Sequence, residues 1–435
     1  MGIKSVTIIG ANGTMGTNVG AIFASFGNCK VYMISRTVEK SEKAIVKAAN
    51  SVRANCVQNN MLPRDYSQLE TCIHESDLVF ESTAEDLKVK QHITELIGRY
   101  ASETTIICTG TSGLSIETLS KSLPVNLRKN YLGVHFFNPP YNLTLCEIIR
   151  GSETDRDLFE TLKIFLREQL LRTVVEVKDK PAFLGNRIGF QFINELLQCA
   201  EIYKYSGGID YIDAVMGGFT GRNMAPLVTT DFVGLDIHKA IVENIYEHTD
   251  DYAKNTFSFP NFADHLVMNG SVGRKAGRGL YSVRNGENGI KERLVYDIEN
   301  DNYRPVINYQ FPFVDKILAY LKVGEYKNAY KYLVKNESQE AVLCVQFLLK
   351  YILYSLKMSD EVGYDIHAAD DAMAAGFNWC PPLAMIDLFQ TFTDFEKLVD
   401  ERIDKKIIQK LDLSLLLEKV VRSNYDYRRY IKAIK

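Results

Sequence analysis

The fold of the N-terminal part of the chain is decided by one stretch, Val6-Thr7-Ile8-Ile9-Gly10-Ala11-Asn12-Gly13-Thr14-Met15-Gly16. Its first four residues favour a short buried strand, and a helix is expected from Thr14 to about Phe26. Glycines between such a strand and helix let the backbone approach a pyrophosphate, to which the helix N-terminus presents free N–H groups. Tight turns also use glycine, but this context predicts a dinucleotide-binding loop formed by Gly10, Asn12, Gly13, Thr14, Met15 and Gly16.

Alternating strand and helix patterns continue to about residue 180. Further strands are expected at 30–34, 77–80, 104–108, 132–137 and 145–149, and a helix at 38–50. This alternation predicts an α/β region with a mostly parallel, doubly wound sheet covered by helices on both faces.

After about residue 180 the apolar residues recur at helical spacing and strand patterns become rare. Helices are expected, for example, at 312–321, 326–334 and 339–357, and the polar stretch 284–293 is a candidate linker. The fold class is therefore α/β plus all-α, with predicted domains at 1–180, 181–284 and 294–435.

The two helical parts contain an internal repeat. A segment that begins Asp213-Ala214 and ends in Phe219 precedes Pro226-Leu227 and Asp231, and the same order recurs from Asp371-Ala372 to Phe377, Pro382-Leu383 and Asp387. This ordered match over two segments indicates a duplicated helical domain.

Composition narrows the classes of function. The 435 residues carry 51 Lys and Arg against 54 Asp and Glu, and this balance does not favour nucleic acid as a partner. Eight scattered cysteines without a C-x-x-C pair, and histidines without metal-ligand spacing, predict reduced thiols and no metal site. We expect no membrane span, no cleavable signal and a cytoplasmic location.

Four polar residues are candidates for chemistry: Ser112 and His135 at predicted strand ends, Glu147 within a predicted strand and Asn186 at the domain junction. Taken singly, Ser112 and Asn186 are explained as well by helix-start hydrogen bonds, and His135 by a structural role. Glu147 lies inside an apolar run, where a carboxylate needs a partner, and a Glu beside an imidazole makes a general acid/base pair.

Together these residues resemble the L-3-hydroxyacyl-CoA dehydrogenase family, in particular 3-hydroxybutyryl-CoA dehydrogenases with a tandem second C-terminal helical domain. The family motifs appear in order, and they are the glycine loop, Glu85-Asp86-Leu87-Lys88-Val89-Lys90, Thr111-Ser112, His135-Phe136-Phe137-Asn138-Pro139, Glu147 and Asn186-Arg187. The match continues through Met224–Asp236 and Gly273–Tyr281, so it covers about residues 3–283 and implies a Rossmann-type N-terminal fold.

The resemblance implies interconversion of L-3-hydroxyacyl-CoA and 3-oxoacyl-CoA with a nicotinamide cofactor. His135 would be the base and Glu147 its support, while Ser112 and Asn186 would bind substrate oxygens. Glu85 and Lys90, expected on the fourth strand and its loop, would lie near the cofactor. Two other hypotheses are a catalytically retired, nucleotide-binding or structural family member and a 3-hydroxyacid dehydrogenase that does not use CoA.

The sequence departs from the family pattern at the cofactor. Asn12 replaces the usual second glycine, and Ser35-Arg36-Thr37 replaces the usual Asp at the end of the second strand. That Asp binds ribose hydroxyls of NAD, whereas Ser35 and Arg36 can donate to a 2′-phosphate, so we expect NADP to be favoured over NAD. The tandem helical domain predicts a monomer with an internal pseudo-dimer, or a dimer formed by another surface.

Overall fold

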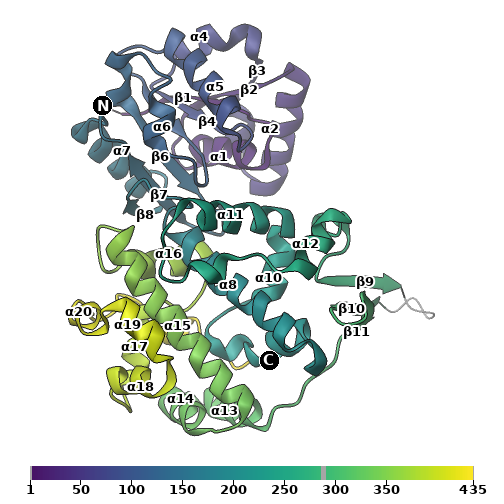
Figure 1. Cartoon of the computed structure of the whole chain (residues 1–435). Coiled ribbons are helices and arrows are strands. Elements are labelled where there is room, and N and C mark those ends of the chain that lie inside the picture. Colours follow the sequence, from purple (N-terminus) through teal and green to yellow (C-terminus); the bar gives the residue numbers. More distant parts are fainter. Residues whose placement is uncertain (1, 286–290, 435) are drawn as a thin grey trace. The chain divides into compact units, whose positions relative to one another are not determined.

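The structure, a computed structural model, describes residues 2–285 and 291–434, which form two compact units (Figure 1). Unit 1 comprises Met1–Phe183 together with Val362–Tyr364, and unit 2 comprises Leu184–Glu361 and Asp365–Lys435. Apart from residues 181–183 and Val362–Tyr364, the two expected helical domains, 181–284 and 294–435, therefore lie in one unit, and the boundary between them stays a prediction.

Unit 1 is built on an eight-stranded sheet in the order β3-β2-β1-β4-β5-β6-β7-β8. The strands are β1 (Ser5–Ile9), β2 (Lys30–Ser35), β3 (Met61–Asp65), β4 (Leu78–Glu81), β5 (Ile106–Thr109), β6 (Tyr131–Phe136), β7 (Leu145–Arg150) and β8 (Thr173–Val177). Neighbouring strands are parallel except for β6 and β7. The strand order reverses between β1 and β4, where doubly wound sheets bind their ligands. The predicted Rossmann-type α/β fold is confirmed.

The two outermost strands of this sheet were not predicted. β3 contains Pro63, which an edge strand tolerates because one side of its backbone makes no ladder bonds. β8 forms the other edge, and there Val177 makes an antiparallel bridge to Gly363 while the N–H of Lys178 donates to the carbonyl of Val362 at 2.8 Å. A short segment from late in the chain thus extends the sheet of unit 1.

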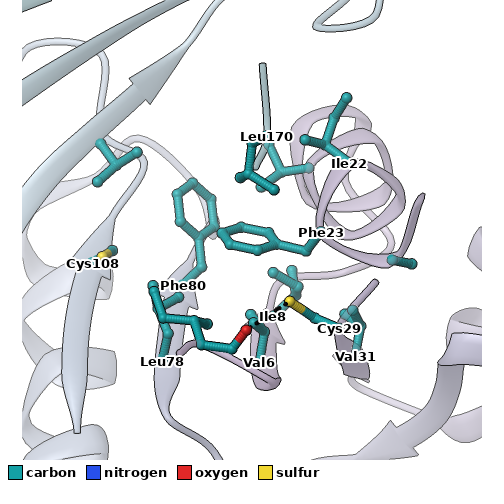
Figure 2. Close-up of a cluster of buried hydrophobic side chains, with 14 of the residues drawn as sticks. Val6, Ile8, Ile22, Phe23, Cys29, Val31, Leu78, Phe80, Cys108 and Leu170 are labelled. Atoms are coloured by element: carbon teal, nitrogen blue, oxygen red, sulfur yellow. Dashed lines mark hydrogen bonds between the residues drawn. The ribbon is translucent and has the colours of Figure 1, made fainter. Parts of the chain in front are cut away.

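The helices of unit 1 pack on the sheet around a continuous apolar core, and the first of them thereby positions the glycine loop that follows β1. They are α1 (Thr14–Ser25), α2 (Val38–Val52), α3 (Asn55–Asn60), α4 (Leu69–His74), α5 (Leu87–Tyr100), α6 (Ile116–Ser120) and α7 (Arg156–Glu168). Figure 2 shows the ring of Phe23 on α1 beside that of Phe80 on β4, with 6.5 Å between centroids. Phe23 also stacks on Phe165 of α7 at 6.2 Å. Burial of these rings holds α1 on the sheet and so positions the loop that precedes it.

The first part of unit 2 is helical, as expected, but it also contains strands. Its helices are α8 (Gly185–Ile202), α9 (Ile209–Val215), α10 (Pro226–Val233), α11 (Leu235–His248) and α12 (Asn261–Met268). β9 (Tyr281–Asn285), β10 (Lys291–Asp297) and β11 (Asn302–Pro305) then form a three-stranded antiparallel sheet. The prediction of a linker at 284–293 is wrong for residues 284–285 and 291–293, which lie in β9 and β10. Residues 286–290 lie outside the described residues.

The second part of unit 2 consists of helices. They are α13 (Pro312–Lys322), α14 (Tyr326–Lys335), α15 (Gln339–Glu361), α16 (Ala368–Phe377), α17 (Pro382–Gln390), α18 (Phe395–Arg402), α19 (Lys405–Leu411) and α20 (Leu413–Glu418). α15 is the one helix in the described residues that is long and apolar enough to cross a membrane, and 72% of its most apolar window is buried inside the protein. Such burial is the pattern of a core helix, so the helix is weak evidence for a membrane span.

The internal repeat is visible in matching helix caps. Asp213 accepts a hydrogen bond from the N–H of Leu227 at 2.8 Å, in the first turn of α10. Asp370 accepts one from the N–H of Leu383 at 2.8 Å, in the first turn of α17. Each helix begins with Pro and receives a buried carboxylate at its N-terminus, which satisfies otherwise unpaired N–H groups.

A second pair of contacts also recurs. The hydroxyl of Tyr281 donates to Asp213 at 2.6 Å, and the hydroxyl of Tyr425 donates to Asp371 at 2.6 Å. The two roles of Asp213 are thus divided between Asp370 and Asp371 in the second copy. Shared contacts of this kind support a duplication.

Arg222 joins the two copies within unit 2. Its guanidinium lies 4.0 Å from the ring of Phe192 on α8, and 4.8 and 4.7 Å from the rings of Tyr351 and Trp379 in the second copy. Arg222 is 1% exposed, so these cation–π contacts are desolvated and correspondingly strong.

Candidate active site

His135 and Glu147 face each other across the antiparallel pair β6 and β7. Nδ1 of His135 lies 2.7 Å from Oε2 of Glu147, and the two residues are 5% and 0% exposed. The rings of Phe137 and Phe183 lie 4.7 and 5.6 Å from the imidazole. Donation from Nδ1 to the carboxylate fixes the tautomer and leaves Nε2 as the nitrogen that can accept a proton.

The glycine loop is shaped so that only glycine fits at two positions. Gly10 has a φ of 83°, and a Cβ there would lie 2.4 Å from the carbonyl oxygen of Ser82, which follows β4. A Cβ on Gly16 would lie 2.4 Å from the carbonyl oxygen of Gly10. No side chain caps the N-terminus of α1, so its first N–H groups are available to an anion. The loop therefore fits the pyrophosphate of a dinucleotide, beside the exposed Asn12 and Thr14.

Lys90 was expected on the fourth strand or its loop, but it lies on α5. It is 1% exposed, and its Nζ lies 2.9 Å from Glu81 and 3.6 Å from Glu85. Burial alone raises the pKa of Glu81, but Lys90 and the hydroxyl and N–H of Thr83 outweigh burial, so the pKa lies below its usual value. Lys90 thus neutralises a buried carboxylate at the end of β4.

Glu85 connects this cluster to the loop that follows β5. Its Oε1 accepts hydrogen bonds from the hydroxyl of Thr111 at 2.6 Å and from the N–H of Ser112 at 2.7 Å. Glu85 is exposed and Ser112 is half-buried. The observed role of Glu85 is therefore to hold the Thr111-Ser112 loop at the carboxyl ends of β4 and β5, near the position expected for a cofactor.

The end of β2 differs from the sequence expectation in detail. Ser35 is 1% exposed, and its hydroxyl has no hydrogen-bond partner within the described residues, so a ligand phosphate does not reach it without local movement. Thr37 caps the first turn of α2, while Arg36 is exposed. Asp65, which no sequence pattern marked, ends β3 and is paired with Ser35 in the parallel register.

Comparison with known proteins identifies the family. Residues 5–180 match the family described as 3-hydroxyacyl-CoA dehydrogenase, NAD binding domain, and residues 183–283 match 3-hydroxyacyl-CoA dehydrogenase, C-terminal domain. The chain belongs to the 3-hydroxyacyl-CoA dehydrogenase family. The resemblance recognised in the sequence is thereby confirmed, and the matched N-terminal domain is that of an NAD-binding family.

Members of the 3-hydroxyacyl-CoA dehydrogenase family from several organisms are similar to this chain. A probable 3-hydroxyacyl-CoA dehydrogenase of Bacillus subtilis is 27% identical over 91% of this chain and 52% of its own length. The human mitochondrial hydroxyacyl-coenzyme A dehydrogenase is 29% identical over 65% of this chain and 92% of its own length. The chain spans about half the length of the B. subtilis relative.

A solved structure shares the fold over almost the whole chain. The 3-hydroxybutyryl-CoA dehydrogenase of Escherichia coli K12 is 19% identical, with a TM-score of 0.69 over 96% of this chain and 99% of that one. The likeness therefore includes the second helical segment, which lies beyond the family match at 183–283.

The site residues expected of this dehydrogenase family lie in both units. His135, Glu147 and Ser112 belong to unit 1, where His135 and Glu147 form a direct contact. Asn186 lies in the first turn of α8, is 7% exposed and belongs to unit 2. In the described residues no group of three His, Cys, Asp or Glu side chains could hold a metal ion.

Proposed function

We propose that the protein interconverts L-3-hydroxyacyl-CoA and 3-oxoacyl-CoA by hydride transfer with a nicotinamide cofactor. The observation that carries this proposal is the buried hydrogen-bonded pair of His135 and Glu147. It lies in the part of the chain that matches the NAD-binding domain of the family. A nicotinamide ring supplies the electron sink when it is bound, so the protein's own task is to move one proton and orient the substrate.

In the oxidative direction, Nε2 of His135 accepts the proton of the 3-hydroxyl group as hydride leaves C3. Glu147 stabilises the imidazolium that forms, because its carboxylate already accepts a hydrogen bond from Nδ1. The hydroxyl of Ser112 and the side-chain amide of Asn186 donate hydrogen bonds to substrate oxygens. In the reductive direction, His135 returns the proton to the carbonyl oxygen.

The proposed cofactor preference is NADP(H) over NAD(H), and Arg36 is the residue that supports it. Its exposed guanidinium follows β2, where a 2′-phosphate is recognised in such folds. Ser35 and Thr37 give less support than the sequence indicated, since the first hydroxyl is buried and the second caps α2. Asp65 beside Ser35 acts in the opposite sense, because its carboxylate repels a phosphate.

The partner and the assembly are proposals too. The substrate is an acyl-CoA, and the helical repeat supports a monomer in which the second copy covers the apolar faces of the first. α15 and α16 both pack on α8 within unit 2. Neither nucleic acid nor a membrane is proposed as a partner, and the proposed location is cytoplasmic.

A comparison of two substrates tests this function against its alternatives. Acetoacetyl-CoA and free acetoacetate are offered separately to the purified protein with NADH and with NADPH. Turnover of acetoacetyl-CoA alone is the expected result. Preference for the free acid would favour a CoA-independent 3-hydroxyacid dehydrogenase, and no turnover of either would favour a retired family member.

A further inference from the structure

A cavity of about 270 Å³ lies within unit 2, apart from the residues to which the proposed catalysis is assigned. Its wall combines α9 and the short helix η4 (Gly218–Thr220) with residues 306–311 and α13. Its apolar lining residues include Ala214, Val228, Val306, Phe311, Val314 and Ile434. Carboxylates, arginines, asparagines and tyrosines also line the cavity, so its wall is both apolar and polar. A concave wall of this kind can hold a small molecule and orient it by its polar groups.

The two carboxylates in the wall are already bound by the protein. Asp210 accepts hydrogen bonds from Nη1 and Nη2 of Arg304 at 2.9 and 2.7 Å. Asp213 accepts one from the hydroxyl of Tyr281 at 2.6 Å and another from a backbone N–H. Burial raises the pKa of Asp213 to about 7, which reduces its negative charge at neutral pH. These acids therefore leave little negative charge to repel an anion.

Two arginines in the wall form no ion pair within 4 Å of a carboxylate among residues 2–285 and 291–434, although the charge of Arg293 acts on the nearby Asp213 and Asp231. Arg293 is exposed on β10, and its guanidinium lies 4.4 Å from the centre of the Tyr281 ring. Arg222 is buried, and its Nε and Nη2 have no hydrogen-bond partner in that same part of the chain. The paired N–H groups of a guanidinium match the two oxygens of a carboxylate. An anion nearby stabilises a buried cation that has no counter-ion.

We propose that this cavity binds a small carboxylate that carries a short apolar chain. Arg293 binds the carboxylate, and Arg222 adds positive potential from the wall. The chain contacts Val228, Val306 and Phe311, which a compact inorganic anion does not reach. All of these residues belong to unit 2, so binding at this site does not require His135.

The test is calorimetric titration of the full-length protein with hexanoate. We expect a dissociation constant below about 1 mM, which corresponds to a modest binding free energy. Arg293→Gln should weaken binding by about tenfold or more, as loss of a charge-assisted hydrogen bond does. Lys291→Gln is the matched control, because Lys291 is exposed on the same strand and does not line the cavity. Its affinity should equal that of the wild type.

Two further probes separate charge from shape. Hexanamide has the chain without the charge, and inorganic phosphate has charge without the chain, so each should bind at least about tenfold more weakly than hexanoate. Val306→Trp, which fills the cavity, should abolish hexanoate binding while circular dichroism shows an intact fold. The proposal is overturned by no hexanoate binding up to about 10 mM. It is also overturned if phosphate or hexanamide binds as tightly as hexanoate, or if Arg293→Gln and Val306→Trp, when folded, bind like the wild type.

Discussion

His135 and Glu147 form their 2.7 Å contact because they are directly opposed in the register of β6 and β7, the antiparallel pair of the described eight-stranded sheet. Opposed residues of an antiparallel pair point to the same face of the sheet. The backbone ladder therefore sets the geometry of the pair, and loop conformation has little influence on it.

The first prediction concerns this pair. His135→Ala and Glu147→Gln should each lower kcat by about 10²-fold or more, the usual contribution of a general acid/base group. Since Glu147 acts through the imidazole, the double variant should be little slower than either single variant. Steady-state kinetics of all three variants measure this. Losses that multiply would show that the two residues act independently.

The second prediction concerns the cofactor. Arg36→Ala should lower kcat/KM for NADPH by about tenfold or more and leave that for NADH nearly unchanged, because only NADPH carries the 2′-phosphate. Asp65→Asn should have the opposite effect and raise kcat/KM for NADPH, since it removes a neighbouring negative charge. Parallel assays with both cofactors measure this. A wild type that prefers NADH, together with an equal effect of Arg36→Ala on both cofactors, would refute the preference for NADP(H).

The third prediction concerns pH and the buried Asp213. Burial raises its pKa to about 7 in the folded state, against an ordinary value of 3.8. Between these values the folded state binds more protons than the unfolded state, so this group's contribution to stability is lost as pH rises toward and through 7. Asp213→Asn removes the titration, so its free energy of unfolding should fall less than that of the wild type between pH 5 and 8.

Urea unfolding at several pH values measures this difference, which should exceed about 1 kcal/mol. Asp157→Asn, at an exposed position in the first turn of α7, is the control and should follow the wild type. Parallel pH profiles for Asp213→Asn and the wild type would mean that Asp213 is already ionised in the folded protein.

The fourth prediction concerns the second helical copy. Deletion of residues 294–435 removes Trp379 and the α15 and α16 helices, and so uncovers Phe192 on α8. The exposed apolar face should cause dimerisation or aggregation, whereas the full chain should be a monomer or a dimer that uses another surface. Light scattering after size-exclusion chromatography measures both. A well-behaved soluble monomer after the deletion would argue against intramolecular pairing.

Strong local patterns made much of the fold predictable. The stretch from Val6 to Gly16 combines a buried strand, a glycine loop and a helix, and the structure has all three. β3 could not be predicted in the same way, because it is an edge strand with Pro63 and polar residues and has no apolar run. β9 and β11 are short strands without buried residues, and only the Leu294–Tyr296 run of β10 is buried, so their pairing with one another, more than their composition, makes them a sheet.

The site was predictable where a charged residue lies in an apolar stretch of the sequence. Glu147 in an apolar run required a partner, and the register supplies His135. Asp65 carried no such signal, because its proximity to Ser35 arises from the pairing of β2 with a strand that was not predicted. Lys90 was expected on the fourth strand or its loop, but Asp86 caps a helix that begins at Leu87 and places Lys90 in α5. Its burial, which depends on the ion pair with Glu81, was not expected either.

The most direct test of the central claim is the rate of acetoacetyl-CoA reduction by the wild type and by His135→Ala, with NADH and NADPH in parallel. The account predicts turnover by the wild type with at least one cofactor and a loss of about 10²-fold or more in the folded variant. A wild type without turnover on either cofactor, or a variant as fast as the wild type, would contradict it.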